Sequence, residues 1–96
     1  MKMTKSQINE MFWHEVNGLE RPEEEGEQSY NLEGLCYGDP KEIVYMNALI
    51  NWKWEEDSFQ HAFGTESDGY FEPYIMFAEI VGEMNEQILD ITNIVQ

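Results

Sequence analysis

Four acidic residues near the C-terminus recur at steps of four, three and four: Glu79, Glu83, Glu86 and Asp90. On a helix, these steps keep the carboxylates in one narrow band and space neighbours by roughly 4.5–6 Å. A rigid row of carboxylates at this spacing suits binding to Arg and Lys, because the guanidinium fork takes a carboxylate and a phosphate in the same way. The row predicts a surface that occupies a groove built for a nucleic-acid backbone.

The alternative for this row is the solvated outer face of an ordinary surface helix. Such faces usually mix both signs, because opposite charges four residues apart stabilise a helix. Here no Lys or Arg follows Lys53, so every such pair within the row is repulsive. The one-signed pattern favours mimicry of a polyanion over plain solvation.

A second acidic group is expected around a hairpin tip and the loop after it. It contains Glu55, Glu56, Asp57, Glu66, Asp68 and Glu72. A polar connector over residues 20–29 adds Glu20, Glu23, Glu24, Glu25 and Glu27. We expect negative potential over most of the surface, with both the row and the hairpin group as partner-binding residues.

The net charge of the 96-residue chain is -15, from twenty acidic and five basic residues. Solubility of a small domain needs a net charge of only about 2–8, and a larger excess costs folding free energy through self-repulsion. The resulting negative field would attract a strongly basic protein partner. Nucleic acids and anionic membranes would be repelled by it, so neither is an expected ligand.

Catalytic or metal chemistry has weak support in the residue types. The alternative of a metal-binding regulator or enzyme rests on His61, Glu66 and Asp68, but this spacing matches no calcium-binding loop. The single cysteine, Cys36, has no basic neighbour to activate its thiol and cannot form an intrachain disulfide. We expect no cofactor, no metal and no enzymatic activity, in a bacterial cytoplasm.

The N-terminal half predicts one helix followed by strands. A capping box of Thr4 and Gln7 begins a helix over residues 4–17, which Asn17-Gly18 ends with a left-handed residue. Residues 30–37 suit a first strand with Gly34 as a weak point or bulge. Residues 43–54 alternate apolar side chains on one face up to Trp52 and Trp54, which favours a strand. A helix starting at Asp39-Pro40 is the alternative there.

The C-terminal half predicts a turn at 55–58, a third strand at Phe59, His61 and Phe63, and a loop over 65–73. Apolar residues at helical spacing then predict a long helix from Tyr74 to about Ile94. The expected fold is a single α+β domain: an N-terminal helix, a three-stranded antiparallel sheet and a long C-terminal helix packed on it.

In size, charge and regularly placed acids such as Glu79, Glu83, Glu86 and Asp90, the chain resembles the small acidic inhibitors of bacteriophages and mobile elements. That group includes anti-CRISPR proteins, anti-restriction proteins and other DNA mimics. The resemblance implies inhibition without catalysis, by blocking the nucleic-acid groove of a CRISPR effector or restriction component. An immunity-type inhibitor of a nuclease toxin is the nearest alternative. Trp13, Trp52 and Trp54 are either core residues or exposed interface anchors, and the oligomeric state is open.

Overall fold

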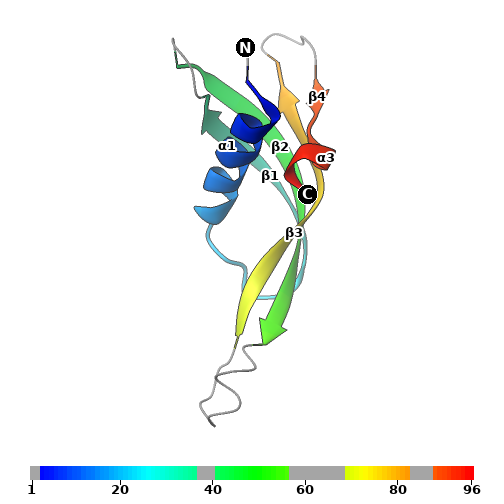
Figure 1. The fold of residues 1–96 in the computed structure, drawn as a ribbon. Helices are drawn as coiled ribbons and strands as arrows, with labels where there is room; N and C mark the ends of the chain where they lie inside the picture. The colour runs from blue at the N-terminus through cyan, green and yellow to red at the C-terminus, as the bar shows by residue number, and fades with distance from the viewer. Residues whose placement is uncertain (1–2, 37–40, 57–68, 83–87) are drawn as a thin grey trace.

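A computed structural model describes residues 3–36, 41–56, 69–82 and 88–96 of the chain. The elements follow in the order α1 (Lys5–Asn17), β1 (Gly26–Leu35), β2 (Ile43–Glu56), β3 (Gly69–Val81), β4 (Leu89–Asp90) and α3 (Thr92–Val95). The strands form one sheet in the order β1-β2-β3-β4, with antiparallel neighbours (Figure 1). Each strand therefore lies beside the one that precedes or follows it in the sequence.

Helix α1 begins at the predicted capping box. Gln7 N–H donates to Thr4 Oγ1 at 3.1 Å, and Thr4 N–H donates to Gln7 Oε1 at 2.9 Å. The helix ends at Asn17, as predicted, but Gly18 has a right-handed conformation (φ -84°, ψ -7°) rather than a left-handed one. Gly18 N–H donates to the Glu15 carbonyl at 3.2 Å and Leu19 N–H donates to the Val16 carbonyl at 3.1 Å, so the helix ends without a positive φ.

Strand β2 is the centre of the sheet and confirms the strand predicted over residues 43–54, with the alternating burial ending at Trp52. It pairs with β1 from Ile43 to Trp52 and with β3 from Tyr45 to Glu56. One face of it is buried at every second residue. The residues on that face are Val44, Met46, Ala48, Ile50 and Trp52.

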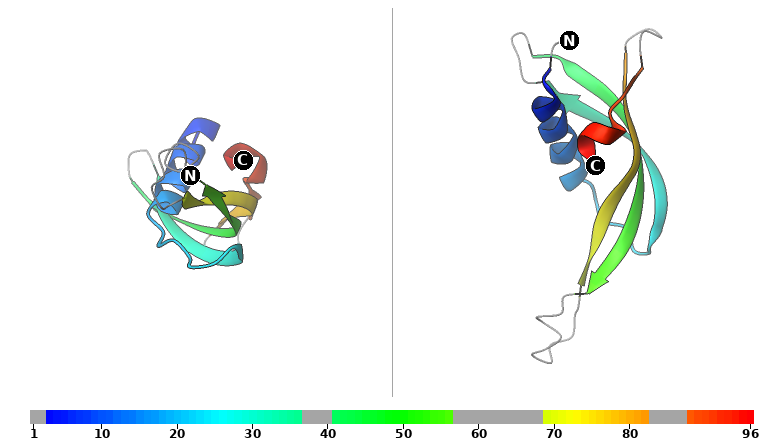
Figure 2. Two further views of the ribbon diagram at one scale, coloured as in Figure 1. Left: turned by 90° about the horizontal axis from the view of Figure 1, so that it is seen from below. Right: turned by 45° about the vertical axis from the view of Figure 1, so that its right-hand side comes forward.

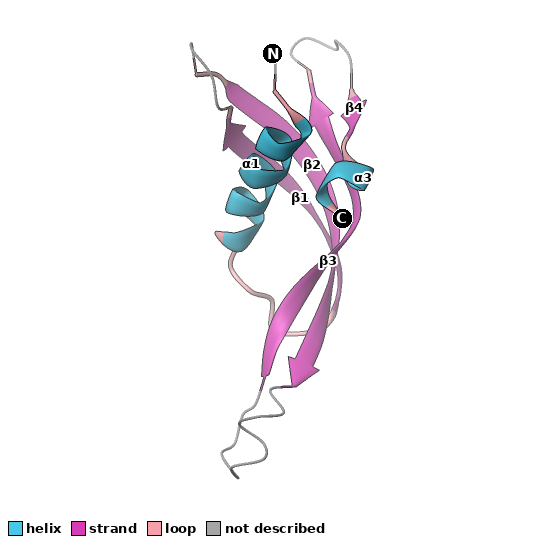
Figure 3. Cartoon of the chain, viewed as in Figure 1, coloured by secondary structure: helices cyan, strands magenta, loops and turns pink. Residues whose placement is uncertain are grey.

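Both helices lie on one face of the sheet (Figures 2 and 3). The core forms between them and β2, through Phe12 and Val16 of α1 and through Ile91 and Val95 at α3. Trp13 ties the two helices together, because its indole N–H donates to the Val95 carbonyl at 2.9 Å. We call the opposite sheet face, which neither helix covers, the open face.

Strand β1 lets α1 approach the sheet closely. A Cβ on Gly34 would lie 2.6 Å from Met11 Cγ and 2.9 Å from Met46 Cε. Gly34 therefore marks a close helix–strand contact rather than a weak point of the strand. β1 also begins at Gly26, so the acidic connector is shorter than predicted and its end belongs to the sheet.

The predicted long helix over residues 74–94 is wrong. Residues up to Val81 form β3, and the C-terminal helix is α3, which spans only Thr92–Val95. The predicted sheet of three strands is also wrong, since the described residues form a sheet of four strands. The strand that pairs with β2 on the side away from β1 is β3, Gly69–Val81, although residues 69–73 were predicted as part of a loop. Glu55 and Glu56 were predicted in a turn and instead belong to β2. The predicted strand at Phe59, His61 and Phe63 lies outside the described residues.

Strands β2 and β3 continue past the helices as a two-stranded ribbon. We call residues 53–56 of β2 and 69–72 of β3 the arm, and the remainder of the described chain the body. Figures 1 and 2 show the arm leaving the body beyond both helices, and the molecule as a whole is elongated, 52 × 24 × 21 Å. No helix in the described part of the chain is long and apolar enough to cross a membrane.

Candidate protein-binding surface

The open face of the body carries both carboxylates and apolar side chains. The register across the four strands places the following side chains on it: Glu27, Ser29, Asn31, Glu33, Tyr45, Asn47, Leu49, Asn51, Tyr74, Phe77, Glu79, Val81 and Asp90. Tyr45, Tyr74 and Phe77 are exposed. Exposed aromatic side chains with a charged surround are typical of protein-binding surfaces.

The carboxylates on the described surface are not paired with Lys or Arg. The one ion pair among the described residues joins His14 to Glu15 at 4.0 Å. Two of the basic side chains lie over aromatic rings instead: Arg21 is 4.9 Å from the centre of the Trp52 ring, and Lys53 is 5.2 Å from that of Tyr74. The negative field of the chain is therefore left largely uncompensated.

Two of the predicted site carboxylates face each other across the sheet. Glu79 of β3 pairs with Asp90 of β4 in the register, so both side chains lie on the same face. Like charges directly opposite on neighbouring strands repel. Each is held by its own donor: Asn47 Nδ2 donates to Glu79 Oε1 at 3.0 Å, and Thr92 N–H donates to Asp90 Oδ1 at 2.8 Å.

Hydrogen bonding keeps Asp90 charged beside this neighbour. Bonding from the Thr92 side chain, and then from the Thr92 backbone N–H, lowers the pKa of Asp90. Thr92 also anchors the C-terminal segment, since its Oγ1 accepts from Ala78 N–H at 3.0 Å. The Glu79–Asp90 pair is thus a fixed, doubly negative point on the open face.

A second charged cluster lies where the arm joins the body. Tyr74 Oη donates to Glu55 Oε1 at 3.0 Å, and this bond, followed by desolvation and the nearby charges, raises the pKa of Tyr74. Lys53 covers the ring of Tyr74 and stands opposite Glu72 in the register. The cluster holds Glu55 in a defined position at the base of the arm.

The structure separates the predicted site residues into two groups. Glu79 and Asp90 are on the open face, while Glu55, Glu56 and Glu72 are in the arm. The predicted helical row does not exist, because Glu79 and Asp90 belong to different strands. The other predicted residues lie outside the described part of the chain: Asp57, Glu66, Asp68, Glu83 and Glu86.

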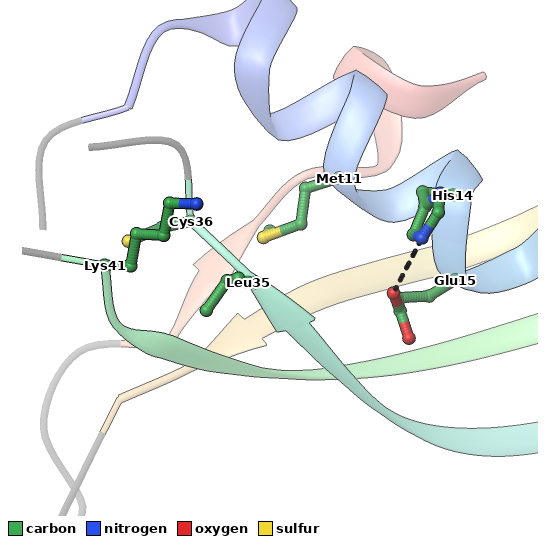
Figure 4. A pocket seen from close by; sticks show the side chains of 6 residues that line it. All are labelled: Met11, His14, Glu15, Leu35, Cys36 and Lys41. Carbon is green, nitrogen blue, oxygen red and sulfur yellow. Dashed lines mark ion pairs between the residues drawn. The ribbon is translucent and has the colours of Figure 1, made fainter. Parts of the chain in front are cut away.

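A pocket beside α1 is too small for a typical ligand. It measures about 190 Å³, whereas ligand pockets commonly occupy about 300–1,000 Å³, and six residues line it: Met11, His14, Glu15, Leu35, Cys36 and Lys41 (Figure 4). His14 pairs with Glu15, and Cys36 is buried with its Sγ accepting from Glu42 N–H at 3.1 Å.

Metal ligands do not cluster within the described ranges, where no group of three or more His, Cys, Asp or Glu side chains is placed to hold an ion. The metal alternative named above rests on His61, Glu66 and Asp68. All three lie outside the described residues, so that alternative stays a prediction.

Comparison with known proteins gives no match to any protein-family model, to any curated protein or to any solved structure.

The exposed aromatic residues of the open face, Tyr45, Tyr74 and Phe77, were not predicted as site residues, because the predicted site consisted of acidic residues alone. Tyr45 and Leu49 alternate with the buried residues of β2, so the apolar character of the second face was visible in the sequence. The sequence leaves Trp54 open between a core position and an exposed one. In the structure Trp54 is 42% exposed, whereas Trp52 is fully buried. No local pattern marks the point where the helices stop covering the strand.

Proposed function

We propose that this chain is a non-enzymatic inhibitor that binds a basic, nucleic-acid-binding protein and blocks its nucleic-acid groove. The observation that carries the proposal is the absence of any Lys–carboxylate or Arg–carboxylate ion pair among the described residues of a chain with a net charge of -15. Unpaired carboxylates on a folded scaffold are available to the Arg and Lys side chains of a partner.

The geometry of the open face supports this proposal in place of the helical row. Alternate residues of a strand lie roughly 6.6–6.8 Å apart and neighbouring strands about 4.8 Å apart, so a sheet presents carboxylates on a rigid grid. Glu79 and Asp90 lie side by side on this grid, with their carboxylates fixed by hydrogen bonds. Fixed groups lose little conformational freedom on binding.

The proposed partner is a bacterial defence protein such as a CRISPR effector or a restriction component, in line with the small acidic inhibitors that the chain resembles. A nuclease toxin is the second candidate, because it offers the same basic groove. Both assignments rest on charge, and charge complementarity mainly gives a fast association rate and partner choice.

The test is a titration of the protein into DNA-cleavage reactions of three purified enzymes: a CRISPR effector nuclease, a restriction endonuclease and a nuclease toxin. We expect at least one to be inhibited at a stoichiometric ratio. Excess DNA added before the inhibitor should protect the enzyme, because both compete for one groove. Inhibition of none of the three, or inhibition that DNA does not relieve, would contradict the proposal.

Two charge-matched variants show whether the open face is responsible. The first carries Glu27→Gln, Glu33→Gln, Glu79→Gln and Asp90→Asn on the open face. The control carries Glu10→Gln, Glu20→Gln, Glu23→Gln and Glu24→Gln, on exposed positions of α1 and the connector. Both lose the same number of negative charges. A larger loss of inhibition in the first variant supports the open face, whereas equal losses indicate only a diffuse field.

A further inference from the structure

Neither α1 nor α3 lies over the arm, unlike the body, in which these helices cover one side of the sheet (Figures 1 and 2). One side of the arm continues the buried face of β2, where Trp54 is exposed, Phe71 is half-buried and packs against the core, and Glu56 lies next to them along the strand. The other side continues the open face and presents Tyr70, which is 57% exposed, with Glu55 and Glu72. Each side thus combines an aromatic group with carboxylates.

The indole of Trp54 is held in one orientation. Its ring lies edge-on to Phe71, with centroids 5.0 Å apart and planes at 70°. On its other flank the backbone of Gly69 packs against it, since a Cβ at Gly69 would come within 2.7 Å of Trp54 Cε2 and Cζ2. The Trp54 backbone N–H donates to Glu25 Oε2 at 2.8 Å, which fixes β2 just beyond the first residue of β1, Gly26.

We propose that the arm enters a groove of the basic partner and that Trp54 is its apolar anchor there. This inference rests on the proposed function and names the part of the surface that supplies affinity. A projecting ribbon that neither helix covers fits a concave surface, which a nucleic-acid groove provides. A pre-oriented indole loses little side-chain entropy on burial, and buried Trp residues are among the commonest sources of binding energy in interfaces.

The charge pattern selects the chemistry of the occupant. Glu25 accepts the hydrogen bond from Trp54 N–H, and Glu56 lies two residues after Trp54 on β2. The pocket that receives the indole should therefore be bordered by Arg or Lys. A second copy of this chain is a poor occupant, because each copy carries a net charge of -15 and the two would repel. The occupant is therefore a cationic protein with an apolar pocket in its groove.

The cross-strand contact of Trp54 with Phe71 also stabilises the ribbon itself. Stabilisation alone does not require the indole to be exposed, and it predicts no preference for one ligand over another. The test must therefore read a ligand preference as well as folding.

Two synthetic octapeptides serve as probes: an alternating Arg–Leu peptide and an alternating Arg–Ser peptide of equal charge. Binding is measured by calorimetry at low salt for the wild type, Trp54→Ala, Trp54→Phe and Ile88→Ala, the last a control that removes an exposed apolar side chain of the body. We expect the Arg–Leu peptide to bind about tenfold or more tightly than the Arg–Ser peptide. Trp54→Ala should abolish this preference, Trp54→Phe should retain part of it, and Ile88→Ala should leave it unchanged.

The outcomes separate the two proposals. Equal binding of both peptides, or a preference that survives Trp54→Ala in a protein with an unchanged far-ultraviolet circular dichroism spectrum, overturns the role of Trp54 and leaves the proposed function standing. Binding of neither peptide contradicts the proposed function, and the role of Trp54 falls with it. If Trp54→Ala unfolds the protein, the preference of the Trp54→Phe variant decides: an undiminished preference overturns the inference, and a reduced one supports it.

Discussion

Strands β2 and β3 pass from the body into the arm without a break, and the two regions differ in what covers them. In the body, α1 and α3 bury every second residue of β2 as far as Trp52. Two residues later, on the same side of the same strand, Trp54 is exposed. The guanidinium of Arg21 lies over the Trp52 ring, at the end of the body from which the arm extends. The sequence alternates in the same way at Trp52 and Trp54. Whether each tryptophan is buried therefore depends on which other elements pack over it.

The two tryptophans give the sharpest test of this difference. Trp52→Ala should lower the free energy of unfolding by about 3–5 kcal/mol, because it empties a site in the core and removes the hydrogen bond from Trp52 Nε1 to Tyr30 Oη, 2.8 Å long. Trp54→Ala should cost less than about 1 kcal/mol, the range of one cross-strand pair. Urea unfolding measures both, and similar losses would show that the arm is part of the core.

Two glycines extend the comparison to the backbone. Gly34→Ala should destabilise the body by about 1–3 kcal/mol, since the new methyl group would displace Met11 and Met46. Gly69→Ala would press on the Trp54 ring and on the Glu55 carbonyl, so it should distort the arm while changing the unfolding free energy much less. Near-ultraviolet circular dichroism should detect the altered environment of Trp54 in Gly69→Ala. Urea unfolding curves should measure the difference in stability between the two variants. A larger loss of unfolding free energy for Gly69→Ala than for Gly34→Ala would contradict the view that the body, rather than the arm, determines stability.

The Glu79–Asp90 pair gives a smaller effect. Glu79→Gln removes the repulsion across β3 and β4 and keeps an oxygen to accept from Asn47 Nδ2. Stability should rise by a few tenths of a kcal/mol at low salt, and the gain should shrink as salt screens the charges. Glu33→Gln, on the edge strand β1, removes the same charge without a carboxylate opposite it, since Glu33 pairs with Tyr45. An equal gain in both variants would assign the effect to net charge alone.

The smallest predicted effect is the pH dependence contributed by Asp90. Its pKa in the folded protein is lowered from 3.8, so the folded state favours the charged form. The stabilisation is fully present above the unfolded pKa and is lost as the pH falls through the lower folded value. Asp90→Asn should therefore flatten the loss of stability on acidification below about pH 3.8, as measured by urea midpoints. If Asp90→Asn lost stability on acidification as steeply as the wild type, the Thr92 hydrogen bonds would not stabilise the charged form of Asp90 in the folded protein.

Local signals in the sequence were sufficient for α1 and β2. The capping box at Thr4 starts a helix in the structure, and the alternation from Val44 to Trp52 forms a strand. Residues 74–81 misled the prediction because a register shift between Leu49 and Ile50 interrupts the alternation of β3. Its buried residues are Ile75, Ala78 and Ile80, and the step of three imitates a helix.

The candidate surface was only partly predictable for a related reason. Acidic residues are visible by type, so Glu55, Glu72, Glu79 and Asp90 were named from the sequence. Their arrangement depends on strand pairing between distant segments, which no short pattern encodes. The pairing of Glu79 with Asp90 is one result of this, and the exposure of Trp54 is another.

The central claim is that the uncovered arm, rather than the helix-covered body, makes the main contact with a basic partner. Backbone chemical shifts of isotope-labelled protein, recorded during titration with the alternating Arg–Leu peptide, test this residue by residue. The account predicts that the largest shift changes fall on residues 53–56 and 69–72, with the Trp54 indole N–H among them, and that smaller ones fall on the open face. Changes centred on α1 and α3, with the arm unaffected, would contradict it.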